Sequence, residues 1–170
     1  MKFPPWSAGQ RITSARLLDA QPDWVMKPGD ESSTTSVLQA DDDLTLPVVA
    51  GAYTFTAQLF IGAGDSAADI KAGFGFPAGS VCHFGSTGAH TGALTSGTSG
   101  VSEHFAIRNA SASSVLGFAV SSGAPTWARL EGVLISAGTG ALTLWWAQNV
   151  PSATATKILA GSWLELRRRS

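Results

Sequence analysis

Apolar and polar residues alternate along most of the chain beyond residue 29, as in strands that bury one face. In the clearest run, residues 53–61, one face carries Tyr53, Phe55, Ala57, Leu59 and Ile61. Further strands are expected at 34–39, 44–49, 70–76, 80–84, 102–108, 115–120, 126–135, 141–148 and 157–167. Turn-forming residues separate these runs about every ten residues, so the sequence predicts an all-β fold, an antiparallel β-sandwich or jelly roll.

Three local features predict how these strands are connected. Asp41, Asp42 and Asp43 favour a solvated turn, and they lack the alternating spacing and glycine of a calcium-binding loop. Pro47 cannot donate a ladder hydrogen bond, which places its strand at a sheet edge. Residues 85–100 are rich in Gly, Ser and Thr and predict one long loop.

Residues 1–28 differ from the rest because they contain four prolines and few alternating positions. The sequence therefore divides into an N-terminal extended arm, 1–28, and a β-sandwich domain, 29–170. Within the arm, residues 13–20 predict a short helix with Thr13 or Ser14 as its cap. The arm carries much apolar surface, which docks either on a partner or on its own domain. The candidate anchoring residues are Phe3, Trp6, Ile12, Leu17, Leu18 and Trp24.

Three strands carry large apolar residues on both faces, at 118–120, 133–135 and 144–146. In a monomeric antiparallel sandwich one face of a strand should be wet, so covered outer faces suggest a homo-oligomer. Cover by loops of the same chain is the alternative. Alternation assigns Trp146 to the core and Trp145 to a neighbouring subunit or the arm. The expected interface residues are Val133, Ile135, Trp145 and Ala147.

Eleven basic and twelve acidic residues give a net charge of −1, which offers no overall field for nucleic acid or an anionic membrane. Residues 72–102 and 132–156 contain no charged side chain, so much of the surface is polar but uncharged. No apolar stretch approaches the ~18 residues of a membrane span. We expect a soluble protein made in a cytoplasm, with no nucleic-acid partner and no membrane insertion.

The residues with reactive side chains form no catalytic or metal-binding set. Cys82 is the only cysteine and predicts a small buried group, and on a strand it points away from His83. The three histidines lack metal-ligand spacing. Residues 62–67 fit a dinucleotide fingerprint and 64–66 resemble an esterase block, but neither has its required context, so a turn is expected. The sequence predicts neither an enzyme nor a bound metal or cofactor.

The opening Trp6-Ser7-Ala8-Gly9-Gln10-Arg11-Ile12-Thr13, followed by Leu17 and Leu18, resembles that of small virion proteins of actinobacterial tailed phages and prophages. Similar landmarks continue at 35–38, 42–47, 69–71, 76–79, 144–149 and 160–164, although the single tryptophan usual before Ala-Gln is doubled here. The resemblance covers nearly all of the chain. Its motifs are structural, so they indicate a building block and no particular chemistry.

The resemblance implies a non-enzymatic virion structural protein, made in the bacterial host cytoplasm and associated with the tail or a fibre. Its expected partners are further copies of itself, with a homotrimer favoured, and other phage virion proteins. A capsid decoration protein is one alternative. Another is a carbohydrate-binding host-adhesion module whose partner is a host surface glycan. Trp127 and Trp163 are its candidate residues, although alternation favours the core for both.

Overall fold

The computed structural model describes residues 21–63, 69–89, 102–107, 109–111, 113–121 and 124–169, together with Gly9, Arg11 and Thr13. This part of the chain forms strands and connecting turns, and it contains no helix. The strands are β1 (Asp23–Met26), β2 (Glu31–Ser33), β3 (Gln39–Val48), β4 (Gly51–Ala63), β5 (Ile70–Gly75), β6 (Val81–Ala89), β7 (Ser102–Ile107), β8 (Val115–Phe118), β9 (Thr126–Ser136), β10 (Gly140–Gln148), β11 (Thr156–Ile158) and β12 (Trp163–Arg169).

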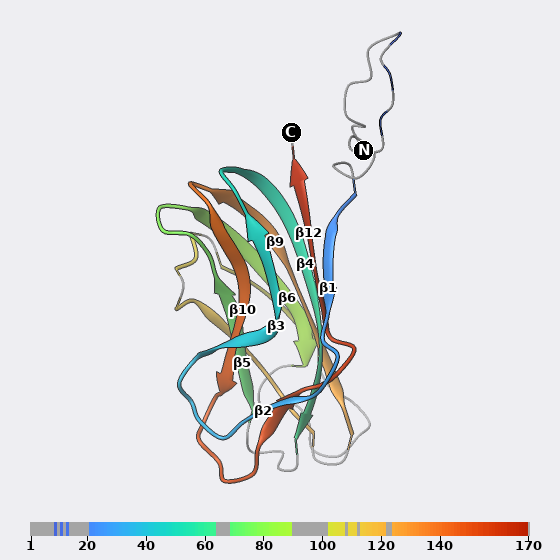
Figure 1. Cartoon of the computed structure of the whole chain (residues 1–170). Coiled ribbons are helices and arrows are strands. Elements are labelled where there is room, and N and C mark those ends of the chain that lie inside the picture. The colour runs from blue at the N-terminus through green and yellow to red at the C-terminus, as the bar shows by residue number, and fades with distance from the viewer. Residues whose placement is uncertain are drawn as a thin grey trace.

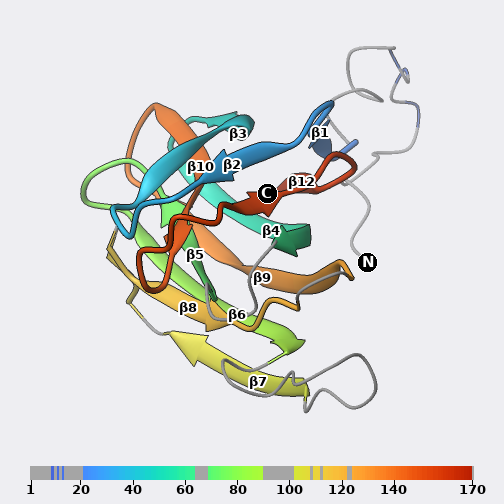
Figure 2. The ribbon, with the colours of Figure 1, turned by 90° about the horizontal axis from the view of Figure 1, so that it is seen from below.

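The strands form two sheets that face each other (Figures 1 and 2). The large sheet has the order β1-β12-β4-β9-β6-β7, and β11 pairs with the end of β4 while β2 pairs with β11. The small sheet has the order β3-β10-β5-β8. Every pairing is antiparallel. The structure therefore confirms the predicted antiparallel β-sandwich.

The core lies between the sheets and uses the faces that alternation predicted. The inward residues of β4 are all buried: Tyr53, Phe55, Ala57, Leu59 and Ile61. Phe74 of the small sheet packs edge-on against Phe55 and Phe84 of the large sheet, with ring centroids 4.7 and 5.4 Å apart. Trp146 and Cys82 are fully buried, as expected. These contacts across the layers join the two sheets into one core.

The edge position predicted for Pro47 is confirmed, because β3 is the outermost strand of the small sheet. Other boundaries differ from the expected ones. Residues 34–38 form no strand, residues 85–89 extend β6, and the run 157–167 is divided into β11 and β12. Gly161 breaks that last run with a φ of 87°, a left-handed backbone that favours glycine.

The large sheet begins inside the segment that the sequence pattern assigned to the arm. Residues Asp23–Met26 form β1, which pairs with β12 from Asp23 opposite Leu166 to Met26 opposite Trp163. Val25 packs against the core between them. The expected helix at 13–20 lies outside the described residues, apart from Thr13. In the described residues no helix is long and apolar enough to cross a membrane.

Candidate interaction surfaces and a buried ion cluster

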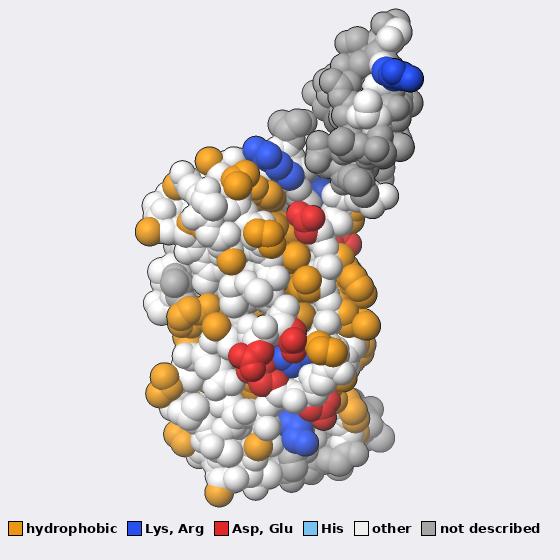
Figure 3. Space-filling model, viewed as in Figure 1, with side chains coloured by type: hydrophobic (Ala, Val, Ile, Leu, Met, Phe, Trp, Pro, Cys, Tyr) orange, Lys and Arg blue, Asp and Glu red, His pale blue; other side chains and the backbone are white. Residues whose placement is uncertain are grey.

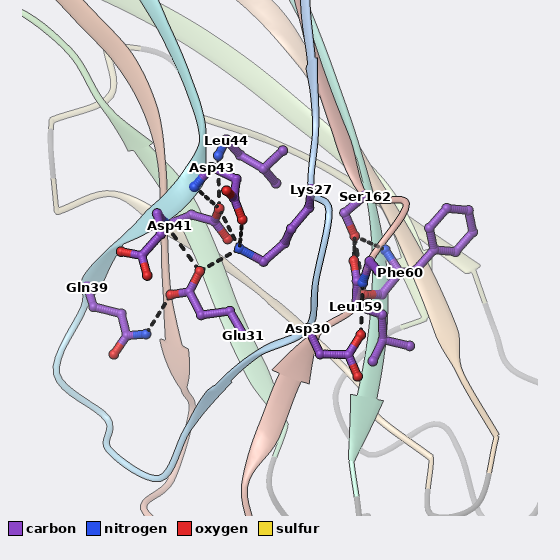
Figure 4. Close-up of polar contacts among 12 residues, drawn as sticks. Lys27, Asp30, Glu31, Gln39, Asp41, Asp43, Leu44, Phe60, Leu159 and Ser162 are labelled. Carbon is purple, nitrogen blue, oxygen red and sulfur yellow. Dashed lines mark hydrogen bonds and ion pairs between the residues drawn. The ribbon is translucent and has the colours of Figure 1, made fainter.

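A buried lysine joins the two sheets at one edge of the sandwich (Figure 4). The backbone of Lys27 is held by the turn before β12: its N–H donates to the carbonyl of Ser162 at 2.7 Å, and its carbonyl accepts from the Gly161 N–H at 2.9 Å. Its ammonium group donates to Asp41 at 2.9 Å and Asp43 at 3.0 Å, both on β3 of the small sheet. Lys27 therefore connects the large sheet to the small one.

A third carboxylate, from Glu31 on β2, accepts from the Lys27 ammonium at 2.6 Å. Burial alone would lower the pKa of Lys27, but the hydrogen bonds that its ammonium group donates to Glu31, Asp41 and Asp43 outweigh burial and raise that pKa above its usual value. In Figure 3 acidic side chains gather around a basic one in the middle of this face. The lysine is only 1% exposed, so it depends on these carboxylates to remain charged in the protein interior.

Asp41 and Glu31 respond in opposite directions to this arrangement. Burial raises the pKa of Asp41, and the bonds from Lys27 and from the Leu44 and Asp43 N–H groups do not fully offset that effect. For Glu31 burial also acts upward, but the hydrogen bond from Lys27 and other donors bring its pKa below the usual value. Of the three carboxylates, Asp41 therefore depends most on Lys27 to stay ionised in the protein interior.

The aspartates do not form the turn that the sequence predicted, because they lie on an irregular part of β3 itself. Ala40 is opposite Trp145 and Thr45 is opposite Thr143, so β3 holds four residues, 41–44, where β10 holds only Leu144. This bulge lets both Asp41 and Leu44 point inward. Among the described residues no group of three or more His, Cys, Asp or Glu side chains could hold a metal ion.

The tryptophan pair on β10 is covered largely by its own chain. Trp146 points into the core, whereas Trp145 lies half-buried on the outer face of the small sheet. There its indole occupies the space above Gly75 of β5, where a Cβ atom would collide with it. Ala147 is fully buried, so its side chain offers no surface to a neighbouring subunit. The run at 118–120 is also buried within the chain.

The run at 133–135 does leave apolar side chains on the surface. Leu134 points into the core, while Val133 and Ile135 are exposed on the outer face of the large sheet, Ile135 at 52%. Val81 of β6 lies directly opposite Ile135 and is exposed as well. These three residues form an aliphatic patch at the end of β9. Val133 and Ile135, two of the expected interface residues, are therefore accessible to a partner.

A second exposed group, which we call the aromatic patch, lies at the other end of β9. Trp127 is 47% exposed, which contradicts the expectation that it belongs to the core. The inward positions of β9 are Ala128 and Leu130, so Trp127 must face outward. Phe60 of β4, directly opposite Trp127, is 38% exposed, and Trp163 of β12 is half-buried.

The exposure of Trp127 is costly for a folded domain. Half of a tryptophan side chain corresponds to roughly 100 Å² of surface, and leaving it in water forgoes about 2.5 kcal/mol of burial free energy.

Of the candidate anchoring residues, Trp24 lies on β1 with its side chain exposed opposite Glu165. The others, Phe3, Trp6, Ile12, Leu17 and Leu18, lie outside the described residues.

The Cys82 and His83 side chains lie on opposite faces of β6, as the sequence indicated. Burial raises the pKa of the Cys82 thiol to about 12, which keeps it protonated near neutral pH. His83 accepts a hydrogen bond at Nδ1 from the Asn109 N–H at 2.9 Å. The two side chains therefore form no thiol and base pair.

Comparison of this chain with models of protein families, with curated proteins and with solved structures found no match. The aliphatic and aromatic patches are accessible to a partner or ligand. The Lys27 cluster is internal, and it joins the two sheets. The sequence signalled Val133 and Ile135 as exposed candidates. It did not signal Phe60, because period-two alternation alone does not tell which face of a sheet is wet.

Proposed function

We propose that the protein is a non-enzymatic structural protein of a tailed-bacteriophage virion. The β-sandwich is exposed on the particle surface, and the N-terminal residues anchor it there. The protein is made in the cytoplasm of the bacterial host and is assembled as a minor tail or fibre-associated component. Decoration of the capsid, with a head-stabilising role, is the alternative placement.

The order of the strands supports this proposal at the level of fold. From β3 to β10 successive strands alternate between the small and large sheets, except for the β6–β7 hairpin. The resulting orders β3-β10-β5-β8 and β4-β9-β6-β7 are those of a jelly roll, an architecture used in viral capsid and lectin domains. This is an analogy of architecture, and it supports a virion role only together with the surface described next.

The aliphatic patch is the observation that carries the assembly proposal. Val81, Val133 and Ile135 are adjacent on a regular sheet face, and each is 40–52% exposed. A patch of this kind is favourable only when another surface removes it from water. We assign it to contacts between copies of the chain, with a closed homotrimer as the favoured assembly.

The position of β1 supports an anchor that begins just before it. Trp24 and Met26 are exposed on the outer face of this edge strand, continuing the apolar character of the preceding residues. β1 itself is held by β12 and by the Lys27 cluster. A segment that leaves the domain at β1 can therefore bind the particle while the sandwich keeps its fold.

Imaging of intact particles tests the proposed location. Density for this protein is expected on the tail or a fibre. Density at the three-fold positions of the head lattice would establish the capsid alternative, and absence from purified particles would refute both.

A deletion tests the proposed anchor in the same system. A variant lacking residues 1–21 should fold, because β1 is retained, but should no longer join the particle.

Oligomer state tests the role assigned to the aliphatic patch. The full chain is expected to have the mass of a trimer in solution at micromolar concentration. Ile135→Asp should shift it to monomer, because an unpaired charge would have to be buried at the contact. Arg129→Asp changes an exposed residue on the same strand and is the matched control, which should remain trimeric. A monomeric parent chain would contradict the assignment.

A further inference from the structure

We propose that the aromatic patch of the large sheet binds a neutral oligosaccharide, with Trp127 and Phe60 as the stacking platform. This site is separate from the aliphatic patch and from the N-terminal anchor. It concerns the isolated protein and does not depend on the location proposed above. Three features of this surface support the proposal: the positions of the aromatic side chains, the polar groups beside them and the balance of charge.

The platform is set by the register of three neighbouring strands. Phe60 of β4 lies directly opposite Trp127 of β9, and both side chains face away from the core. Trp163 of β12 is opposite Gln58, one outward position along β4 from Phe60, which makes it the diagonal neighbour of Phe60. Three aromatic rings thus occupy adjoining positions on a rigid sheet, which limits the entropy lost when a ligand binds.

One end of this platform is closed by an aliphatic side chain. Leu159, from the turn between β11 and β12, lies over Gly62, the next outward position of β4 beyond Phe60. A Cβ atom at Gly62 would be only 3.1 Å from the Leu159 Cδ2 atom, so the glycine makes room for it. The Leu159 side chain therefore stands beside the Phe60 and Trp127 row as an apolar border.

Polar side chains adjoin the rings on their other side. Gln58 and Arg129 are directly opposite each other, in the outward row next to Phe60 and Trp127. Within the described part of the chain the Gln58 amide makes no hydrogen bond, so its donors and acceptor are available to a ligand. A sugar ring presents apolar C–H groups on one face and hydroxyl groups around its edge. Aromatic rings with an amide and a guanidinium beside them match both parts.

The charges on this surface balance in number. Lys157 of β11 lies opposite Gly62 and Glu165 of β12 lies opposite Thr56, so one basic and one acidic residue border the aromatic patch. The Arg129 guanidinium lies 3.1 Å from the Glu131 carboxylate, two residues further along the same face of β9. Both side chains are substantially exposed, so they give the surface donors and an acceptor without a net charge. A neutral ligand fits this balance, whereas an anionic or cationic one would gain nothing from it.

The same composition argues against a second copy of the chain as the occupant. The centre of a stable protein interface is depleted of charged residues, because burial strips them of water. Here Arg129 adjoins Trp127 on β9 and would lie under any partner that covered both rings. The cost of burying that charge disfavours a second copy of the chain as the occupant of the aromatic patch.

The test uses the full chain and an immobilised panel of neutral oligosaccharides built from glucose, galactose or mannose, with sulfated and sialylated glycans included. Binding to at least one neutral glycan is expected, and quenching or shift of tryptophan fluorescence in solution should confirm it. Trp127→Ala should weaken that binding at least tenfold, and Phe60→Ala should weaken it by a smaller factor. Trp127→Tyr should retain most of it, because a ring remains.

Val37→Ala is the control, because Val37 is a strongly exposed apolar residue between β2 and β3, outside the aromatic patch. It should bind as the parent does, and the circular dichroism spectra of all variants should agree. Four results would overturn the proposal. They are no binding of any neutral glycan at millimolar concentration, equal binding by Trp127→Ala, binding restricted to the charged glycans, and self-association of the chain that Trp127→Ala abolishes.

Discussion

Replacing Lys27 by methionine should destabilise the protein strongly, although the shape of the side chain changes little. The substitution removes the ammonium group that lies 2.9 Å from Asp41, whose side chain is fully buried. Removing one partner of a buried ion pair typically costs about 3–5 kcal/mol. Asp41 keeps hydrogen bonds from the Leu44 and Asp43 N–H groups, so we expect the lower half of that range, about 3–4 kcal/mol.

The other two carboxylates add little to this cost. The Glu31 and Asp43 side chains are 15% and 34% exposed, so water solvates them in part when the lysine is absent. Urea unfolding of the full chain, followed by tryptophan fluorescence, measures the free energy of unfolding. Lys157→Met, at an exposed lysine of β11, is the control and should change that free energy by less than about 0.5 kcal/mol.

A second substitution separates loss of charge balance from loss of packing. Asp41→Asn removes the stranded charge but keeps an oxygen that can accept from Leu44 and Asp43. Added to Lys27→Met, it should recover most of the lost stability, since both members of the pair are then neutral. A loss below about 1 kcal/mol for Lys27→Met, the value of an exposed pair, would refute the reasoning. A double variant as unstable as the single one would refute it too.

The cost of Lys27→Met should also depend on pH. The lowered pKa of Glu31 means that its stabilising contribution is present above the unfolded pKa and is lost as pH falls through the lower folded value. The pKa of Asp41 is raised, so Asp41 acts in the opposite sense: its protonation at lower pH stabilises the folded state. Without Lys27, burial raises the pKa of both carboxylates, so acid neutralises them earlier. The difference between parent and variant should therefore shrink as pH falls from 7 towards about 3.

Three further predictions test the packing. Gly75→Ala should cost about 1–3 kcal/mol in urea unfolding by displacing the Trp145 indole, whereas Gly138→Ala, where a Cβ meets nothing within 4 Å, should cost much less. Trp146→Ala should cost about 3–5 kcal/mol and Trp145→Ala clearly less, and equal losses would contradict the assignment of faces. Cys82 should resist iodoacetamide at pH 8 until the protein is unfolded, because burial raises its pKa to about 12, and fast labelling of the native protein would contradict this.

Alternation predicted most strands because it is a local property of strands that bury one face. The run at 53–61 follows it throughout, and β4 has the predicted inward face. It could not identify β1, whose residues become a strand by pairing with β12 at the far end of the chain. Nor could it show which face of β9 is wet at Trp127, because that depends on the partner strands and on what covers them.

The Lys27 cluster was missed for a related reason. Three consecutive aspartates predict a turn when only their neighbours in sequence are considered. Their conformation is set instead by a bulge opposite Leu144 and by the lysine between β1 and β2, neither of which alternation reveals. In the sequence, Lys27 is followed by proline and belongs to no amphipathic pattern, and this does not identify it as buried. Its burial follows from the position of β3, which brings Asp41 to its ammonium group.

The Lys27 cluster also gives the proposed anchor a physical basis. The N-terminal segment enters the domain at β1, and the next residue after β1 is Lys27. Through its backbone Lys27 is bonded to the turn before β12, and through its ammonium group to β3. A force applied to the segment would act first on the pairing of β1 with β12, and Lys27 would then resist further unravelling because it is bonded to both sheets. Under the proposed function, Lys27→Met should weaken the retention of the protein on the particle as well as its stability.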